Sequence, residues 1–411
     1  MDAEIIAVGS ELLTPFYQDT NSLFLTARLN SLGIEVRFKS VVGDRTDDLA
    51  TVFKEALARS QLVILTGGLG PTEDDLTRPV VAEVLGRGLH EDPAIRQQIQ
   101  ERLARFGRPM AENNLRQAML PEGATWLENK HGTAPGIWIE HDHVLVVLLP
   151  GPPGELEAMF DAVCMPRLAQ ASQGQRIRTR VYKVVGLPES EVDKRAAAAY
   201  KSYANPVTTI LAKPGAIEIH LRARAPSDQE ADKLLAELGD QIELALGEYV
   251  FSTQGESLEE VVGMYLVMRH KTLAVAESCS GGLLSERLTH NSGSADFFLG
   301  GAICYSNALK TKLAAVPAAL IDEYGAVSRP VAQAMAEGIR ARTGASLGAS
   351  ITGIAGPTGG SSEKPVGLVF IGVADERGTQ VREFRFPGGR ERVRLWSTQM
   401  ALEMIRRRIR D

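Results

Sequence analysis

Three side chains with chemical potential stand together in the stretch LAVAESCSGGLLSERL, where Ser278, Cys279 and Ser280 follow an apolar run and precede Gly281 and Gly282. An apolar run that ends in small residues and glycines is typical of a strand that turns into a helix. Backbone N–H groups at such a turn can stabilise an oxyanion or bind phosphate. We therefore expect an active site here, with one of the three side chains as the nucleophile.

A serine hydroxyl becomes a useful nucleophile only when a base removes its proton. Histidine is the usual base, but His270 and His290 belong to no recognisable motif. A lysine can replace histidine when burial or neighbouring cations lower its pKa, and Ser–Lys pairs are a known variant of the catalytic triad. Lys310 in GGAICYSNALKTKL is our candidate, with Tyr305 at the end of the preceding strand. Cys279 is better interpreted as a small buried residue.

Two further segments of the C-terminal half suggest a ligand-binding edge. The loop in ITGIAGPTGGSSEKPVG offers backbone groups around four glycines, Gly353, Gly356, Gly359 and Gly360. Arg390 in FPGGR is a candidate phosphate clamp, since a guanidinium group binds phosphate through paired N–H donors. Each candidate also has a structural interpretation. Ser278 can cap a helix and Arg390 can be a first-turn charge, while Lys310 alone can be a surface charge.

A second candidate site lies in LVILTGGLGPTEDDLTRPVV, residues 62–81, where a buried strand ends in glycines and acids. Glycines let the backbone approach a ligand and direct several N–H groups into one space, and a following helix adds its positive dipole end. Acids beside a phosphate site suggest a divalent cation with oxygen ligands. The alternative is a tight turn whose acids only cap a helix.

Ligands of open parallel sheets bind beyond the carboxyl ends of the strands, so residues after neighbouring strands should share this site. Asp44 follows the strand-like SVVG, and Glu11 lies in the turn after the first apolar run. The predicted nucleotide or phosphate site therefore consists of Glu11, Asp44, Thr66, Gly67, Gly68, Gly70, Asp74, Asp75 and Thr77.

The order of apolar and amphipathic segments predicts the elements that hold these residues. EIIAVG, NSLFLTARLNSLG, EVRFKSVVG, DDLATVFKEALARS and LVILTGG indicate a βαβαβ arrangement, hence a parallel sheet covered by helices. A hairpin turned at Lys213-Pro214-Gly215 and a helix capped by Ser227 with Glu230 follow. Another capping box, Ser257 with Glu260, opens a second α/β unit.

The predicted fold class is therefore α/β, with two three-layer α/β domains of mainly parallel sheets joined by a small α+β domain. We place the two larger domains at residues 1–172 and 256–411, and the connecting domain at residues 176–252. The connecting domain contains no catalytic constellation, so we interpret it as a spacer or scaffold.

The bulk composition argues against several classes of protein. The net charge of −6 over 411 residues, with only MIRRRIRD locally basic, argues against a nucleic-acid-binding surface. Three cysteines give no disulfide framework, and no Cys or His pattern of a zinc site occurs. The start MDAEIIAVGSELL lacks the basic residues of a signal peptide, and VLVVLLP is too short to span a bilayer. We expect a cytoplasmic protein without membrane contact.

The acid- and glycine-rich loop resembles a known motif. TGGLGPTEDDLT is similar to the TGGTGP…D-x-T motif of molybdopterin-binding domains, whose two site aspartates fall on Asp44 and Asp75. AENNLRQAMLPEGA, GTAPG and LPGPPGE, with GLPESEVD and AKPGAIEIHL further on, resemble the CinA family of competence/damage-inducible proteins. The resemblance implies that the first domain is an ADP-ribose pyrophosphatase dependent on a divalent metal of unknown identity. The metal ligands would be Asp44, Asp74, Asp75 and Glu155.

The C-terminal motifs ESCSGG, GG-x-x-x-YSN-x-x-K and SITGIAGPTGG-x-x-x-KPVG resemble the nicotinamide-nucleotide amidohydrolase domain of CinA proteins. The resemblance implies hydrolysis of nicotinamide mononucleotide to nicotinic acid mononucleotide and ammonia, with no cofactor. The family's nucleophile falls on Ser278, its base on Lys310 and its assisting hydroxyl on Tyr305. The substrate-binding residues would be Cys279, Ser280, Gly281, Gly282, Gly353, Gly356 and Arg390. Ser280 replaces the usual threonine of this motif, which keeps a hydroxyl and removes a methyl group.

These patterns lead to definite expectations about mechanism and partners. We expect Lys310 to take the Ser278 proton, directly or through Tyr305, and N–H groups near Ser280 and Gly281 to hold the oxyanion. The expected partners are the small nucleotides nicotinamide mononucleotide and ADP-ribose, with no nucleic acid, and the family resemblance suggests a homodimer. Two alternatives remain open: a molybdenum-cofactor protein, or a competence factor for DNA uptake without an enzymatic role.

Overall fold

The computed structural model describes residues 1–171 and 174–410, and these divide into two compact units. One unit contains Met1–Arg178 with Ala223–Leu234, and the other contains Thr179–Arg222 with Leu235–Asp411. The domain ends predicted at residues 172 and 411 lie outside the described residues.

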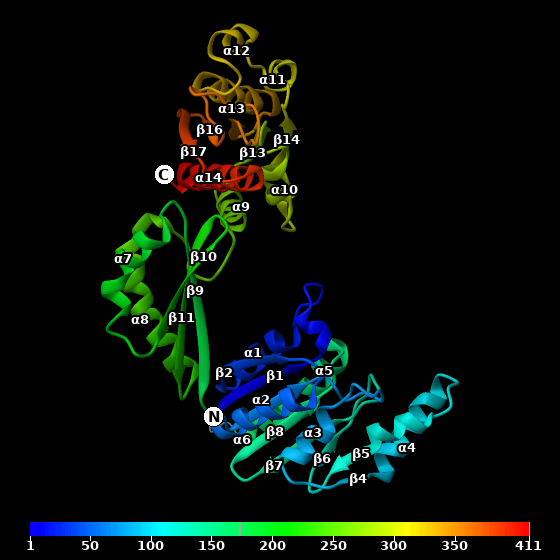
Figure 1. Ribbon diagram of the computed structural model, residues 1–411. Helices are drawn as coiled ribbons and strands as arrows, with labels where there is room; N and C mark the ends of the chain where they lie inside the picture. Colours follow the sequence, from blue (N-terminus) through cyan, green and yellow to red (C-terminus); the bar gives the residue numbers. More distant parts are fainter. Residues whose placement is uncertain (172–173, 411) are drawn as a thin grey trace. The chain divides into compact units, whose positions relative to one another are not determined.

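The N-terminal domain is built on a six-stranded sheet in the order β2-β1-β3-β8-β7-β6 (Figure 1). The strands are β1 (Asp2–Val8), β2 (Glu35–Val42), β3 (Leu62–Thr66), β6 (Thr125–Leu127), β7 (Gly136–His141) and β8 (Val144–Leu149). The first four strands of this order run parallel, β7 is antiparallel to β8, and β6 is antiparallel to β7. The predicted βαβαβ arrangement is confirmed, and its carboxyl edge carries the loops with the predicted site residues.

Helices cover both faces of this sheet, which gives three layers. They are α1 (Asn21–Ser31), α2 (Thr46–Arg59), α3 (Thr77–Val84), α4 (Pro93–Arg105), α5 (Pro153–Met159) and α6 (Met165–Ala171), with a small ribbon of β4 (Leu89–Glu91) and β5 (Met119–Pro121). One apolar core contains Phe53 of α2 and Val81 of α3, and the other contains Leu25 of α1 and Leu156 of α5. β3 lies between the two cores and is buried along its whole length.

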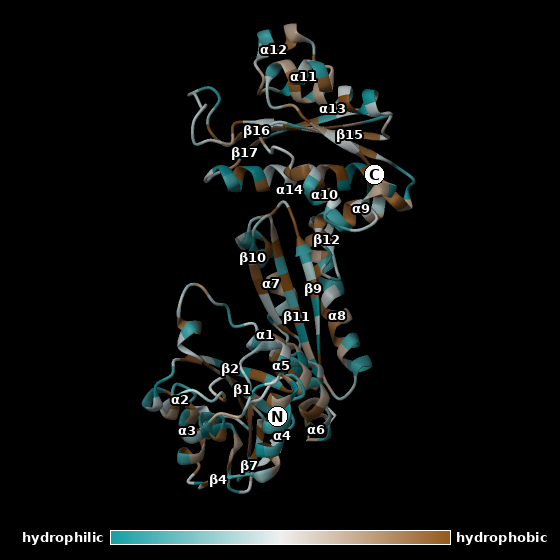
Figure 2. Cartoon of the chain, turned by 90° about the vertical axis from the view of Figure 1, so that its right-hand side faces the viewer, coloured by the Kyte–Doolittle hydropathy of each residue, from teal (hydrophilic) through white to brown (hydrophobic). Residues whose placement is uncertain are grey.

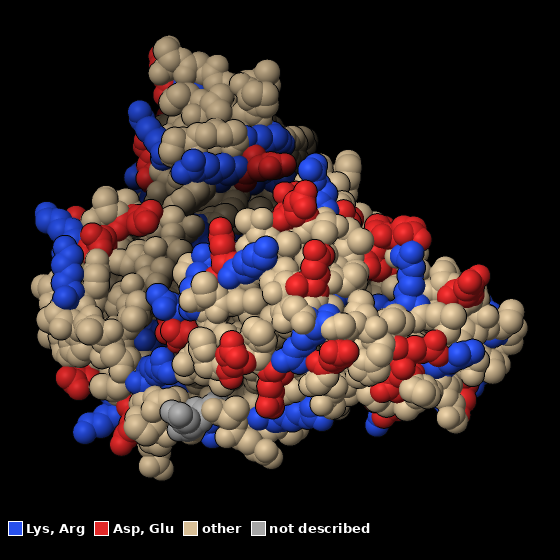
Figure 3. All heavy atoms as spheres, turned by 60° about the horizontal axis from the view of Figure 1, so that its bottom comes forward, with Lys and Arg blue, Asp and Glu red and all other residues tan. Residues whose placement is uncertain are grey.

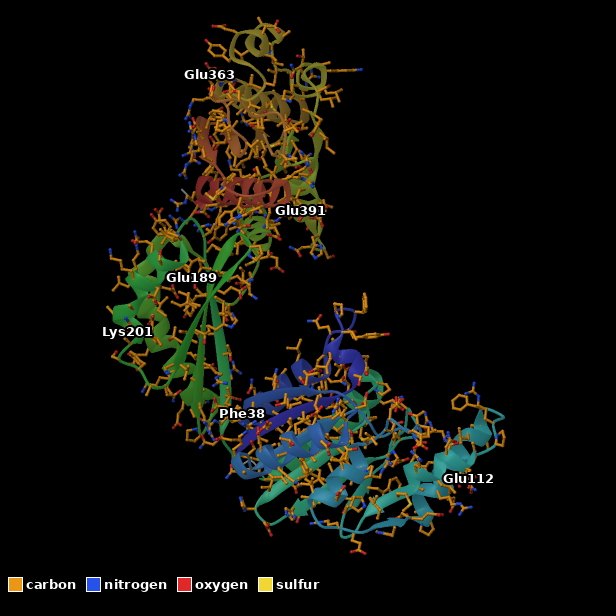
Figure 4. The ribbon with its side chains drawn as sticks, viewed as in Figure 1. Phe38, Glu112, Glu189, Lys201, Glu363 and Glu391 are labelled. Atoms are coloured by element: carbon orange, nitrogen blue, oxygen red, sulfur yellow. The ribbon has the colours of Figure 1, made fainter. Side chains whose placement is uncertain are left out.

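The connecting domain is a four-stranded sheet in the order β10-β11-β9-β12 with two helices. Its elements are β9 (Arg176–Val184), α7 (Glu189–Tyr200), β10 (Val207–Lys213), β11 (Ala216–Ala225), α8 (Asp228–Leu246) and β12 (Val250–Ser252). The predicted hairpin is confirmed, because Lys213 pairs with Ala216 across the turn. Glu189 and Lys201 lie at the two ends of α7 (Figure 4), an acid and a base where the helix dipole favours each.

The C-terminal domain is a five-stranded sheet in the order β14-β13-β15-β16-β17. The strands are β13 (Leu273–Glu277), β14 (Phe298–Ile303), β15 (Leu347–Gly353), β16 (Leu368–Asp375) and β17 (Gly378–Arg385). β13 runs parallel to β14 and β15, β16 is antiparallel to β15, and β17 is antiparallel to β16. β17 must be antiparallel to β16, because the short link between these two strands leaves no room for a crossover.

Six helices complete three layers around this sheet. They are α9 (Leu258–Met268), α10 (Leu283–Thr289), α11 (Asn307–Ala314), α12 (Ala318–Tyr324), α13 (Arg329–Thr343) and α14 (Arg390–Arg410). α9, α10 and α14 contribute to one apolar core, and α11, α12 and α13 contribute to the other. Figure 2 shows the hydrophobic residues concentrated on strands such as β15 and β16. The α/β fold class is thereby confirmed.

The capping box predicted at Ser257 forms in full, and one of the two bonds of the box predicted at Ser227 forms. The Glu260 N–H donates to the Ser257 hydroxyl (3.2 Å), and the Ser257 N–H donates to the Glu260 carboxylate (2.6 Å). The Glu230 N–H likewise donates to the Ser227 hydroxyl (3.2 Å). Within the described part of the chain, no helix has the length and apolar character needed to cross a membrane.

Candidate active sites

Ser278 lies at the point where β13 ends and the chain turns sharply toward α10. Its N–H donates to the Ile351 carbonyl of the neighbouring strand (2.9 Å), and its own carbonyl accepts the Gly281 N–H (3.0 Å). Gly281 and Gly282 adopt left-handed backbone angles, with φ of 63° and 95°, which favour glycine over residues with a Cβ atom. The predicted strand–turn–helix therefore forms, and it fixes the Ser278 side chain at the carboxyl edge of the sheet.

The Lys310 side chain of α11 contacts this serine at the same edge of the sheet. Its Nζ lies 3.0 Å from the Ser278 Oγ, 2.9 Å from the Cys304 carbonyl oxygen and 3.4 Å from the Tyr305 carbonyl oxygen. The lysine is only 2% exposed, and no carboxylate among the described residues contacts its amine. Burial lowers the pKa of Lys310 below its ordinary value because the charged ammonium loses its hydration.

The contacts of Lys310 suit the neutral amine. A neutral amine has two N–H donors and one lone pair in a tetrahedral arrangement. The Lys310 Nζ donates to the Cys304 and Tyr305 carbonyl oxygens and to the Ser278 Oγ. In the neutral form of the amine, two N–H groups serve the carbonyl oxygens and the lone pair faces the Ser278 hydroxyl, whose proton it can accept. The pair thus has the arrangement of a nucleophile and its general base.

Tyr305 contacts the Lys310 amine through its backbone carbonyl, while its side chain turns to solvent and is 58% exposed. The Tyr305 hydroxyl accepts a hydrogen bond from Arg390 Nη2 (3.1 Å), and Arg390 Nη1 donates to the Gly356 carbonyl (3.0 Å). Three predicted residues from separate segments therefore meet beside the serine. A relay through the tyrosine hydroxyl is unnecessary, because the lysine amine contacts Ser278 directly.

The start of α10 is occupied by a buried carboxylate that sequence reasoning missed. Glu277 accepts the N–H groups of Gly282 (3.1 Å), Leu284 (3.0 Å) and Ser285 (2.8 Å). The Gly281 N–H is also engaged, in its bond to the Ser278 carbonyl. Our expectation that this helix start binds phosphate is therefore wrong, and the Gly281 N–H is occupied, whereas an oxyanion contact from the N–H groups near Ser280 stays a prediction. The physical reason is that Glu277, at 1% exposure, already neutralises these donors.

Ser280 and Cys279 have different surroundings from the nucleophile. Arg394 donates two hydrogen bonds to the Ser280 carbonyl (3.0 and 2.9 Å), so a second missed residue fixes the turn. The Ser280 hydroxyl is buried and has no hydrogen-bond partner among the described residues. Burial raises the pKa of the Cys279 thiol to about 12, which disfavours a thiolate near neutral pH. Arg394 follows Arg390 by one helical turn, a spacing that was readable from the sequence.

The N-terminal site is a cavity of about 590 Å³ at the carboxyl edge of its sheet. It brings together nine of the predicted residues: Glu11, Asp44, Thr66, Gly67, Gly68, Gly70, Asp74, Asp75 and Glu155. Thr77 is absent from the cavity wall. Its hydroxyl instead donates to the Gly67 carbonyl (2.7 Å) and holds the glycine loop from behind, so its predicted place in the ligand site is wrong.

The two aspartates of the predicted motif organise the loops around the cavity. Asp75 accepts the Gly70 and Thr72 N–H groups, both at 2.8 Å. Asp44 accepts the Ser10 N–H (2.8 Å), and its own N–H donates to the Ser10 hydroxyl (3.0 Å). Each aspartate thus fixes backbone and also presents carboxylate oxygen to the cavity.

The predicted metal ligands surround the cavity without forming a cage. Within residues 1–171 and 174–410, no three His, Cys, Asp or Glu side chains are close enough to hold a metal ion by themselves. A cation such as Mg²⁺ needs only one or two carboxylates when substrate phosphates and water supply the remaining ligands. Asp44, Asp74, Asp75 and Glu155 fit that shared type of site.

Three family descriptions match successive parts of the chain. "Probable molybdopterin binding domain" matches residues 4–170, "Damage-inducible protein CinA KH domain" matches residues 179–252, and "CinA C-terminal domain" matches residues 255–409.

Relatives match over the full length. A CinA-like protein of Koribacter versatilis is 52% identical, with 100% of each chain covered. A putative competence-damage inducible protein of Moorella thermoacetica is 45% identical, covering 100% of this chain and 99% of the relative. Among solved structures, CinA from Thermoplasma acidophilum, whose function is given as unknown, is 34% identical over 40% of this chain and 96% of its own, with a TM-score of 0.38.

Proposed function

Because the chain belongs to the CinA family, we propose that its C-terminal domain hydrolyses the carboxamide of nicotinamide mononucleotide to a carboxylate and ammonia. The observation that carries this proposal is the buried Ser278–Lys310 pair, with 3.0 Å between hydroxyl and amine. Such a pair can cleave the carbon–nitrogen bond of a carboxamide, since the carbonyl carbon is electrophilic and the nitrogen can leave as ammonia.

The proposed reaction proceeds through an acyl-enzyme. Lys310 takes the hydroxyl proton as the Ser278 oxygen attacks the carboxamide carbon. The carbon–nitrogen bond then breaks as the Lys310 ammonium gives that proton to the amide nitrogen, which leaves as ammonia. Water then attacks the ester, again with Lys310 as base, and releases nicotinic acid mononucleotide and free Ser278. An activated hydroxyl supplies the nucleophile, so the reaction as proposed uses no cofactor.

Arg390 is suited to hold the substrate phosphate. Its contacts with Gly356 and Tyr305 use two of the five N–H donors of a guanidinium group. The remaining donors are available for a phosphate, which we propose as their ligand.

Ammonia release from nicotinamide mononucleotide tests the proposal. We expect Ser278→Ala to abolish release, because no nucleophile remains, and Ser280→Ala to retain measurable turnover. Both variants should be measured beside the parent chain, with folding checked by circular dichroism. Turnover in Ser278→Ala together with its loss in Ser280→Ala would transfer the nucleophile to Ser280, and turnover in both would overturn the mechanism.

For the N-terminal domain we propose a metal-dependent hydrolase of ADP-ribose. The cavity combines a glycine loop, suited to phosphate, with carboxylates suited to a divalent cation, and this observation favours a phosphoanhydride as the substrate. When bound, the metal would neutralise phosphate charge and activate water. The assay is release of AMP and ribose 5-phosphate with added Mg²⁺ or Mn²⁺, before and after chelation by EDTA. Equal release with and without EDTA would contradict the metal requirement.

The alternative of a DNA-uptake factor has less support from the residues. Domains of the KH type clamp nucleic acid through a Gly-x-x-Gly loop, and residues 179–252 contain no such sequence. The basic C-terminal segment is engaged within the chain, since Arg406 bonds to Glu403 (2.7 Å) and Arg408 bonds to Asp375 (2.9 Å). A molybdopterin-binding role would be tested by titrating the pterin onto the intact chain.

A further inference from the structure

A second cavity lies where the end of α14 meets the turn between β16 and β17, and it shares no lining residue with either candidate active site (Figure 1). Its volume is about 520 Å³. Its wall includes one acid, Glu248, and four arginines, Arg377, Arg382, Arg407 and Arg408. Guanidinium groups around one space repel one another unless carboxylates or a bound anion compensate their charge.

Two of these arginines share a single carboxylate. Asp375, a buried side chain, accepts from Arg377 Nε (2.9 Å) and from Arg408 Nε (2.9 Å). Arg377 also donates to the Arg408 carbonyl, and Arg408 donates to the Gly378 carbonyl (3.1 Å). These bonds explain how the strand turn is held to the end of the helix, but they leave one charge of the pair uncompensated.

Arg407 also shares both of its acids with other arginines. Glu403 accepts from Arg407 Nε and, at 2.7 Å, from Arg406 Nε. A carboxylate oxygen of Glu248 lies 3.0 Å from Arg407 Nη1 and 3.7 Å from Arg410 Nη2. The ion pairs at this end of α14 therefore do not neutralise its arginines one by one.

Arg382 of β17 makes no hydrogen bond or ion pair with the described residues. Its guanidinium carbon lies 5.1 Å from the centroid of the Phe384 ring, a contact that places the side chain without using its five N–H donors. A charged residue on an edge strand can prevent pairing with other chains, but that role does not require it to line a cavity with three further arginines.

The charges beside the cavity are therefore unequal. Five arginines meet three carboxylates, namely Arg377, Arg382, Arg406, Arg407 and Arg408 against Asp375, Glu248 and Glu403. Glu337, which accepts from the Thr379 hydroxyl of the wall (2.7 Å), still leaves the arginines in excess. An anion with more than one negative charge would compensate this excess.

We propose that this cavity binds a di- or triphosphate group, free or carried by a nucleotide. Phosphate oxygens bond to the N–H donors that Arg382, Arg407 and Arg408 do not use within the chain. The volume of about 520 Å³ is within the range of small-molecule sites, which is about 300–1,000 Å³. Since no aromatic side chain of the described residues lines the cavity, it offers no surface on which a base could stack.

Calorimetric titration of inorganic triphosphate onto the full chain tests this site. EDTA in the buffer keeps divalent cations from bridging phosphates to the N-terminal cavity. We expect Arg382→Ala to weaken binding by about tenfold or more, because charge-assisted hydrogen bonds to phosphate are lost. Arg382→Lys keeps the charge without the paired donors and should fall between Arg382→Ala and the parent. Arg385→Ala is the matched control, since it removes an exposed arginine of the same strand that lies outside the cavity.

A parallel titration with ATP separates the phosphate group from its carrier. We expect ATP and triphosphate to bind within about twofold of each other, because the cavity offers no contact to a base. The site is overturned if Arg382→Ala binds triphosphate like the parent, or if Arg385→Ala weakens binding equally, which would indicate a general attraction to charge. Loss of binding in Arg382→Ala for ATP alone would reject the phosphate group as the determinant.

The site is independent of the two proposed hydrolase activities. Arg382→Ala should therefore release ammonia and cleave ADP-ribose at the parent's rates, and circular dichroism should show that the variant is folded. Loss of either activity in this folded variant would overturn the separation of the cavity from the active sites. Absence of both activities in the parent would reject the hydrolases and leave the titrations to decide the phosphate site.

Discussion

At the scale of single residues, reactivity in the C-terminal site depends on where one proton resides. Lys310 is surrounded by two carbonyl oxygens and a hydroxyl, and no carboxylate in residues 1–171 or 174–410 contacts its amine. Burial without a counter-ion favours the neutral amine, which lowers the pKa of this lysine. A lysine can therefore serve as the base where histidine is the usual choice.

The first prediction concerns this proton. Lys310→Arg keeps a cation of similar length but cannot lose its proton, so we expect ammonia release to fall by about 10²–10⁴-fold. In the parent chain kcat/KM should rise with pH through the lowered pKa of Lys310, because only the neutral amine accepts the serine proton. Lys312→Arg, exposed on the same helix, is the control and should leave rate and pH profile unchanged. A parent profile that is flat or falls across that range would contradict Lys310 as the base.

The sequence predicted which residues would carry the reaction but not all of their contacts. The motif placed Ser278, Lys310 and Arg390 near one edge, and the structure brings all three there. Whether the lysine acts directly or through Tyr305 depends on side-chain directions that spacing does not determine. Glu277 was missed for a related reason, since an acid at a strand end usually faces water and only the turn of the chain makes it a cap.

At the scale of elements, two charged side chains hold the turn after β13 in place. Arg394 of α14 holds the Ser280 carbonyl, and Glu277 holds the N–H groups that begin α10. The left-handed glycines between them have no side chains with which to hold the turn. The position of the Ser278 hydroxyl therefore depends on a cap and a clamp, each supplied by a charged side chain.

The second prediction tests the cap. Glu277→Gln removes the charge and replaces one acceptor oxygen by a donor that opposes the N–H groups of α10. We expect a loss of about 1.5–3 kcal/mol in the free energy of unfolding, measured in urea, together with a fall in kcat. Glu363→Gln is a matched control, because Glu363 is exposed in a loop of the same domain (Figure 4). Unchanged stability of Glu277→Gln would show that the cap contributes little.

Elements with a strong periodicity of hydrophobic residues were predicted well. Elements with a weak periodicity were not. The βαβαβ segments, the hairpin and both capped helices follow from local patterns, because each pattern determines its own structure. β17 was not predicted, since GTQVREFR is largely polar and pairs along one side only, at the end of the sheet. Burial is what produces a readable alternation, so exposed edge strands give little signal.

At the scale of the whole molecule, one face can be judged for charge, and on it acids and bases are mixed rather than concentrated. Acidic and basic side chains alternate over the face drawn in Figure 3, on which the N-terminal domain comes forward. A mixed surface with a net charge of −6 suits a protein that binds small nucleotides at defined sites better than one that follows a nucleic-acid backbone.

The last prediction is that the two proposed activities are independent. The N-terminal cavity is lined only by residues of the first unit, and Ser278, Lys310 and Arg390 all belong to the second. Sites that share no residue and no hydrogen-bond network should respond additively to substitution. We therefore expect Lys310→Ala to abolish ammonia release and leave ADP-ribose hydrolysis within about twofold, and Glu155→Gln to impair ADP-ribose hydrolysis and leave ammonia release within about twofold.

The reciprocal assays should be run on the same full-length preparations, each with the second substrate absent and then saturating. Independence requires that saturating nicotinamide mononucleotide leaves the KM for ADP-ribose unchanged, and that the converse holds, since a coupling between binding sites is reciprocal. A shift in one constant would have to appear in the other with the same factor if it reflects binding. Such a matched pair of shifts would show that the sites are energetically coupled. The coupling would then require residues outside both sites.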